Sequence, residues 1–163
     1  MNIVSQLDTK WKDIPFPGTT YLWGNYGCLA SCICMLLGKT PLELMAENKD
    51  GWEINGNLKT SQVLAKYGYK LVSVDYDEGE TLPTKRPLYI ARTSLLSPTY
   101  PTHFYILKQD GTIIDPGSIY NPKATNRYKL RTNQVRYLLP LDVPVSQPTI
   151  DQRVARLESA VFN

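Results

Sequence analysis

The spacing of hydrophobic positions predicts three helices in the first 70 residues. Residues 28–38 form an apolar run without proline that closes on a glycine, which is typical of a buried helix with a left-handed C-cap. Thr40, Pro41 and Glu43 match an N-cap, a proline at the first helical position and a capping-box glutamate, which predicts a helix through about residue 47. Apolar positions within residues 57–67, followed by glycine, predict a third helix.

After residue 68 the pattern changes to one of strands. Short segments rich in β-branched and aromatic residues are separated by Gly, Pro and Asp, as expected for strands joined by turns. The predicted strands are residues 69–76, 87–92, 103–108, 112–115, and 127–130 or 135–139. Because the helices precede the strands rather than alternate with them, we expect an α+β fold with N-terminal helices on a C-terminal antiparallel sheet.

The chain fits one domain followed by a short appendage. A protein of 163 residues hides about two thirds of its unfolded surface, which is enough for one core. We place the domain over residues 1–142, and interpret residues 143–163 as a proline-rich linker and a short C-terminal helix. That helix either docks on its own domain, which we favour, or begins a longer stalk that makes oligomers. Its apolar seam has heptad spacing: Ile150, Val154, Leu157 and Val161.

The composition predicts a soluble protein with reduced thiols. No apolar run approaches the roughly 20 residues that span a bilayer, and the N-terminal residues lack the regions of a signal peptide. We therefore expect no membrane span and a cytoplasmic site of synthesis. The three cysteines, Cys28, Cys32 and Cys34, are odd in number and too close together to staple distant segments.

Charge is divided unevenly along the chain. Residues 1–80 carry seven Lys and no Arg against ten acids, whereas residues 81–163 carry four Lys and seven Arg against five acids. An anionic polymer would suit the segment between Pro116 and Pro140, but a solvated face of a strand pair is the simpler interpretation, since no nucleic-acid motif is present. We expect no nucleic-acid partner. The segment has five basic residues and no acid: Lys123, Arg127, Lys129, Arg131 and Arg136.

Cys28 is the candidate nucleophile among the three thiols. Most cysteines on apolar helices are small core residues, and we interpret Cys32 and Cys34 in this way. Cys28 differs because it begins the predicted helix, where free N–H groups and the helix dipole favour a thiolate. A zinc site built from these thiols and His103 is disfavoured, because Cys34 points about 120° away from Cys28 on a helix. We expect no metal and no cofactor.

His103 is the only histidine, and a predicted hairpin brings Asp115 beside it. Residues 109–111, Gln-Asp-Gly, suit a three-residue loop with glycine in the left-handed bulge position, which sets Asp115 opposite Tyr105. Asp115 then shares a sheet face with His103, and diagonal neighbours lie about 7 to 8 Å apart, within reach of a carboxylate. A two-residue loop would shift the register and send Asp115 to the other face.

Four motifs follow one another in an order typical of one family. They are Ser5-Gln6-Leu7-Asp8 with Trp11; Tyr26-Gly27-Cys28 opening an apolar helix with Met35 and Gly38; Thr102-His103-Phe104; and Ile114-Asp115-Pro116. Over about residues 3–118 the chain resembles the papain-like cysteine peptidases related to bacteriocin-leader-processing (double-glycine) proteases. It departs from the usual family pattern at Leu29-Ala30, where Gly-Pro is common, and at Thr102, where Gly is common.

The resemblance implies a papain-like fold and a Cys-His-Asp triad. Cys28 would be the nucleophile, His103 the general base and later acid, and Asp115 the group that orients the imidazole. The Gln6 side chain and the Cys28 backbone N–H would form the oxyanion hole, because an amide offers N–H donors without titrating. The alternative interpretation is that Gln6 is an ordinary surface residue with no part in catalysis. Four aromatic residues are candidates for cleft walls or for core packing: Trp11, Trp23, Tyr26 and Trp52.

The implied reaction is hydrolysis of an amide bond in a peptide or in peptidoglycan. Relatives of this type cut leader peptides or cell-wall cross-links, and a domain without transporter helices fits a peptidoglycan endopeptidase of a bacterial or phage system better. The basic second half and the lack of a signal peptide are compatible with a virion-associated enzyme or one released at lysis. Two alternatives stay open: an inactive papain-like binding or structural module, and an acyl or amide transferase with the same triad.

Overall fold

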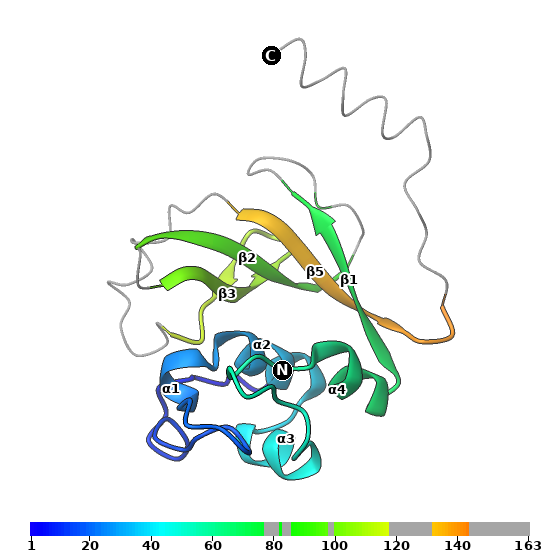
Figure 1. Cartoon of the computed structure of the whole chain (residues 1–163). Helices are drawn as coiled ribbons and strands as arrows, with labels where there is room; N and C mark the ends of the chain where they lie inside the picture. Colours follow the sequence, from blue (N-terminus) through cyan, green and yellow to red (C-terminus); the bar gives the residue numbers. More distant parts are fainter. Residues whose placement is uncertain (77–81, 83–85, 98–99, 118–131, 144–163) are drawn as a thin grey trace.

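The protein has a layer of helices packed under a twisted antiparallel sheet (Figure 1). This computed structural model describes residues 1–76, 82, 86–97, 100–117 and 132–143. Within these residues the sheet has five strands in the order β1-β5-β2-β3-β4. The architecture is therefore α+β, as the order of the hydrophobic patterns predicts.

Two of the three predicted helices are confirmed with their caps. Helix α2 spans Cys28–Leu37 and ends at Gly38, whose φ of 68° is left-handed. Helix α3 spans Pro41–Glu47, and its capping box pairs Thr40 with Glu43 in both directions. The Glu43 carboxylate accepts the Thr40 backbone N–H at 2.8 Å, and the Thr40 hydroxyl accepts the Glu43 N–H at 3.3 Å. Local sequence thus determines where α2 ends and where α3 begins.

The other two helices correct the predictions. Helix α4 spans Thr60–Lys66 rather than 57–67, because Leu58 is held in a short antiparallel bridge with Trp52. Helix α1, Trp23–Tyr26, is a four-residue turn that the hydrophobic pattern does not reveal. It leads through Gly27 directly into α2.

The strands agree with the predictions in place and differ from them in length. They are β1 Tyr69–Asp75, β2 Leu88–Ser97, β3 Tyr100–Lys108, β4 Ile113–Ile114 and β5 Thr132–Pro140. β2 and β3 are longer than expected because they pair with each other along most of their lengths. The alternative strand at 127–130 and the linker and helix at 144–163 lie outside the described residues, so the domain boundary stays a prediction.

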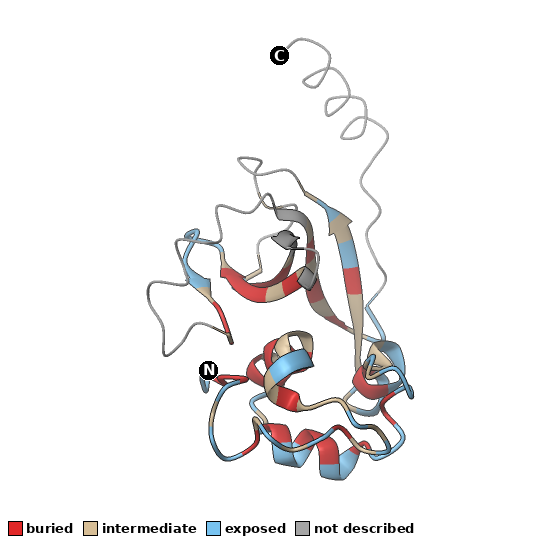
Figure 2. Ribbon diagram, turned by 60° about the vertical axis from the view of Figure 1, so that its left-hand side comes forward, coloured by how far each residue is buried: buried red, intermediate tan, exposed pale blue. Residues whose placement is uncertain are grey.

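The sheet is buried on both faces. Ile90 and Ile106 belong to the core between the sheet and the helices, whereas Tyr89 and Val135 belong to a second cluster on the opposite face. Alternation along each strand separates the two sets. In Figure 2 the lowest helix, α3, has buried residues on its upper side, toward the rest of the domain, and exposed residues on its lower side.

The apolar character of α2 is explained by its place in this core. It packs mainly on β3, with Cys32, Ile33 and Cys34 fully buried. Within the described residues no single helix is long and apolar enough to cross a membrane. Only the pair α2 and α3, bent by 92° at the break between them, has the required length and apolar composition when taken together.

Replacing Thr40 with Ala tests the capping box of α3. The Thr40→Ala variant loses the acceptor for the Glu43 N–H, which we expect to lower the free energy of unfolding by about 1 kcal/mol. Urea denaturation measures this difference. Thr9→Ala, at an exposed position outside any helix, is the control and should leave stability unchanged; equal losses in both variants would contradict the assignment.

Candidate active site

The hairpin between β3 and β4 has the predicted loop and register. Ile106 lies opposite Ile114, and Gly111 has a left-handed φ of 83°. This pairing continues to place Asp115 opposite Tyr105. The prediction that Asp115 and His103 are neighbours on the hairpin is therefore confirmed, and a two-residue loop is excluded.

His103 and Asp115 form a buried hydrogen bond. Their side chains meet with 2.8 Å between His103 Nε2 and Asp115 Oδ1, and the residues are 8% and 3% exposed. Because an ionised carboxylate only accepts hydrogen bonds, the proton of this bond belongs to Nε2. The Gly117 backbone N–H donates to the same oxygen at 2.7 Å. The carboxylate thus fixes both the ring orientation and the tautomer, leaving Nδ1 as the second functional nitrogen.

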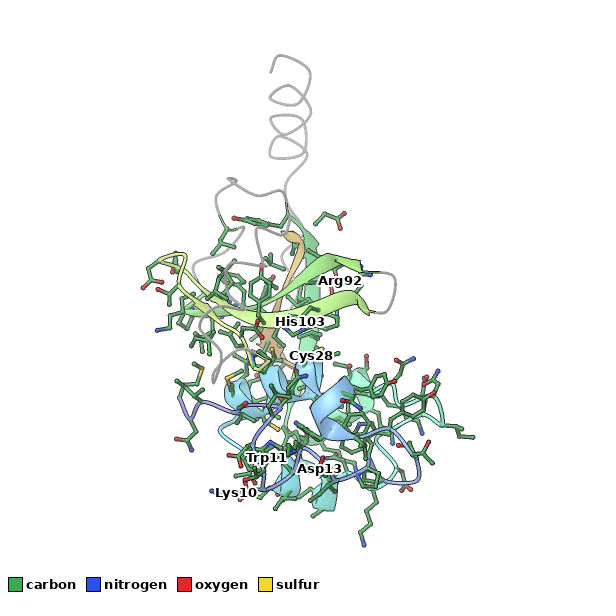
Figure 3. The ribbon with its side chains drawn as sticks, turned by 90° about the vertical axis from the view of Figure 1, so that its left-hand side faces the viewer. Lys10, Trp11, Asp13, Cys28, Arg92 and His103 are labelled. Atoms are coloured by element: carbon green, nitrogen blue, oxygen red, sulfur yellow. The ribbon has the colours of Figure 1, made fainter. Side chains whose placement is uncertain are left out.

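The thiol of Cys28 is the other partner of the imidazole. Figure 3 shows His103, on β3, next to Cys28 at the start of α2. Cys28 is partly exposed, whereas Cys32 and Cys34 have no exposed surface. Burial raises the pKa of both of these thiols well above the ordinary value. Of the three cysteines, Cys28 alone combines solvent access with a base.

The charge state of His103 depends on burial, which opposes the charge, and on its two neighbours, which favour it. Burial disfavours the imidazolium, but hydrogen bonds to Asp115 and to Cys28, together with their negative charges, outweigh it and raise the pKa of His103 to about 9. The site therefore stabilises a positively charged ring between two acidic groups at neutral pH.

Close packing explains why glycine precedes Cys28. A Cβ at Gly27 would lie 2.5 Å from the Trp23 carbonyl oxygen and 2.7 Å from its indole ring. Trp23 is fully buried, and its indole N–H donates to Ser31 Oγ at 3.0 Å. The turn of α1 is thus locked against α2, and this contact sets the position at which Cys28 enters the helix.

Gln6 is buried between the two halves of the site. Its backbone N–H donates to the Pro116 carbonyl at 2.9 Å, and its side-chain Nε2 donates to the Gly24 carbonyl at 2.8 Å. The residue is 8% exposed, so the alternative of a surface residue is wrong. One bond to Gly24 leaves Nε2 a second N–H to donate.

The segment that carries Gln6 is held to the domain on both sides. The Trp11 indole N–H donates to the Ser5 carbonyl at 2.7 Å, and the Ser5 hydroxyl donates to the Pro116 carbonyl at 3.2 Å. Trp11 is therefore a core residue that positions the N-terminal segment. The segment covers the turn after Asp115, which helps to keep the carboxylate away from water.

A cleft of about 230 Å³ opens beside Cys28. Tyr26 and Trp52 line it, whereas Trp11 and Trp23 are in the core. Trp52 has both roles, because it also belongs to that core and is 5% exposed. Of the wall formed by residues 52–58, sequence reasoning found Trp52 but not residues 55–58. The lining consists of Phe16, Asn25, Tyr26, Cys28, Leu29, Ala30, Trp52, Asn55, Gly56, Asn57, Leu58, Thr102 and Phe104, and has no charged side chain.

The described part of the chain contains no group of three or more His, Cys, Asp or Glu side chains able to hold a metal ion. Comparisons with known proteins add no assignment to this site. No known family model matches the chain, and no curated protein matches it either. The geometry of the site is therefore the basis for the functional conclusion.

The single histidine permits a direct measurement of the charge at the site. We expect the NMR signal of the His103 ring to titrate near pH 9 rather than near the ordinary pKa of 6.5, because Asp115 and Cys28 stabilise the imidazolium. Cys28→Ala and Asp115→Asn should each lower the midpoint. A wild-type midpoint at or below 6.5 would show that the ring lacks these partners.

Protonation of His103 also makes stability depend on pH in a defined direction. Since folding raises the pKa of His103 from 6.5 to about 9, its contribution is complete below pH 6.5 and is lost as the pH rises through 9. The difference in unfolding free energy between wild type and His103→Gln should therefore shrink between these values. A difference that grows with pH would contradict the assignment.

Proposed function

We propose that the protein is a papain-like cysteine peptidase that hydrolyses amide bonds through Cys28, His103 and Asp115. The observation that carries the proposal is the imidazole held between a buried carboxylate and a partly exposed thiol at the start of a helix. A nucleophile, its base and an orienting group are the parts that thiol catalysis requires. The cleft beside Cys28 provides room for the substrate.

In the first half of the reaction the Cys28 thiolate attacks the carbonyl carbon and forms a C–S bond. The carbonyl π electrons move to oxygen and give a tetrahedral oxyanion. When this intermediate collapses, the C–N bond breaks and the His103 imidazolium gives its Nδ1 proton to the leaving amine. Asp115 remains ionised throughout and holds Nε2–H in place.

In the second half, neutral His103 takes a proton from water, which attacks the thioester carbon. Collapse of this second intermediate releases the carboxylic acid and restores the Cys28 thiolate beside the imidazolium. His103 must therefore be charged in the resting enzyme, where it acts as an acid, and neutral in the acyl-enzyme, where it acts as a base. Loss of the thiolate charge on acylation removes one of the interactions that favour the imidazolium.

The oxyanion hole in this proposal consists of the remaining Gln6 amide N–H and the Cys28 backbone N–H. The first N–H groups of a helix have no partner within it, so that of Cys28 is suited to this role. The hydrogen bond from Gln6 to Gly24 anchors the amide on the turn that precedes the nucleophile. Donors fixed before the reaction stabilise an oxyanion without reorganising.

Hydrolysis of purified peptidoglycan and of generic peptides tests the function. We expect wild type to release new amino groups and Cys28→Ala to release none, because the nucleophile is missing. Cys34→Ala is the matched control, since this thiol is buried on the same helix and should keep the activity. Equal release by wild type and Cys28→Ala would exclude the proposed mechanism.

Gln6→Ala tests the oxyanion hole separately from the triad. Removing one such donor should lower kcat about 10²- to 10³-fold with little change in KM, because the interaction forms in the transition state. Gln62→Ala, an exposed amide on α4, should behave like wild type. A Gln6→Ala enzyme with unchanged kcat would remove Gln6 from the mechanism.

A further inference from the structure

Two arginines lie next to a ring that lines the active-site cleft. Arg92 on β2 is directly opposite Phe104 on β3, and the Arg136 guanidinium on β5 stacks over the same ring at 5.0 Å from its centre. Arg136 also donates from Nε to Gln134 Oε1 at 2.9 Å, and Gln134 is the β5 residue paired with Arg92. Arg92, Arg136, Phe104 and Gln134 are thus a cluster of neighbours across three adjacent strands.

This cluster is on the sheet face that turns toward the helices. Ile90 and Ile106, which belong to the core between sheet and helices, are two residues away from Arg92 and Phe104 on the same strands. Because side chains alternate along a strand, Arg92 and Phe104 share that face. Phe104 is part of the cleft wall, and the two arginines neighbour it on the sheet without lining the cleft themselves. Figure 3 shows Arg92 on the sheet, on the same side of the molecule as His103 and Cys28.

The two cations have no acidic partner in the described part of the chain. No ion pair involves Arg92 or Arg136 among the described residues. Asp75 is the nearest acid by strand pairing, opposite Gln134, and it is exposed and bonded to neither arginine. Burial, and then the charge of Arg92, lower the pKa of Arg136. Two partly buried guanidinium groups at one place are unfavourable unless an anion joins them.

We propose that Arg92 and Arg136 form a carboxylate-binding subsite at the sheet end of the active-site cleft. Guanidinium groups bind carboxylates through paired N–H donors. Arg136 uses its Nε for the bond to Gln134, and no residue that the structure describes accepts a hydrogen bond from its terminal nitrogens. The cleft lining itself has no Lys, Arg, Asp or Glu, so in this proposal the neighbouring arginine pair selects the charge of the ligand. If the protein is the peptidase proposed above, on which this inference rests, its substrate is a peptide with an acidic side chain or a free C-terminus near the cleaved bond.

Binding of three matched peptides to the full chain tests the subsite. The Cys28→Ala variant prevents turnover, and NMR shifts of the arginine Nε–H signals give the dissociation constants. The peptides are acetyl-Ala-Ala-Glu-amide, acetyl-Ala-Ala-Gln-amide and acetyl-Ala-Ala-Gln with a free carboxylate. We expect at least one acidic peptide to bind about tenfold or more tightly than the neutral amide. Tighter binding of the Glu peptide would identify a side-chain carboxylate as the ligand, and tighter binding of the peptide with a free C-terminus would identify a terminal carboxylate.

Substitution of the arginines completes the test. Arg92→Gln and Arg136→Gln should each remove the preference for the acidic peptide while leaving the neutral one unaffected. Arg86→Gln is the control, because that guanidinium stacks on Tyr137 at 5.4 Å, and Tyr137 belongs to the cluster on the opposite sheet face. Equal binding of the three peptides, a preference that survives both substitutions, or a loss that Arg86→Gln reproduces would overturn the proposal.

The outcome is distinguishable from failure of the proposed function. Peptide binding is measured without the thiol, so a charge preference in an enzyme that hydrolyses nothing would support the subsite and not the peptidase. Hydrolysis of neutral and acidic peptides at equal kcat/KM would support the peptidase and not the subsite.

Discussion

The hydrogen bond between His103 and Asp115 is the interaction on which the rest of the site depends. Asp115 is 3% exposed, and a carboxylate removed from water is costly unless hydrogen-bond donors surround it. The imidazole N–H and the Gly117 N–H supply those donors to one oxygen. Their arrangement orients the other side of the ring toward Cys28 and makes the imidazolium favourable at neutral pH. One buried carboxylate thus determines the tautomer and orientation of the ring, and together with Cys28 it favours the imidazolium.

Three distant parts of the chain converge on this bond. The β3–β4 hairpin provides the histidine and the aspartate, α1 and α2 provide the thiol, and the N-terminal segment covers the turn after Asp115 through Gln6 and Ser5. The fold contributes rigidity at each point, through the Gly27 contact with Trp23 and the packing of α2 on β3. The sheet face that turns toward the helices continues from the cleft to the arginine pair, so that the proposed catalysis and the proposed charge selection use the same surface.

Sequence predicts the parts of this arrangement that local rules determine. The apolar run ending at Gly38 identifies α2 and places Cys28 at its start, and the Gln-Asp-Gly loop sets the register that brings Asp115 to His103. What sequence misses depends on contacts between distant segments. The bridge from Trp52 to Leu58 shortens α4 and forms a cleft wall, and the stacking of Arg136 on Phe104 results from β5 pairing with β2 rather than with its neighbours in sequence.

Selective alkylation tests most directly whether Cys28 is a reactive thiol paired with His103, because the experiment needs no substrate. Iodoacetamide at neutral pH, with the modified residue identified by mass spectrometry, should label Cys28 and leave Cys32 and Cys34 unmodified in the folded protein. Replacing His103 with Ala should slow labelling of Cys28, since the thiol loses the base beside it. Labelling of Cys28 that is as slow as that of the buried thiols, or that does not respond to His103→Ala, would contradict the account.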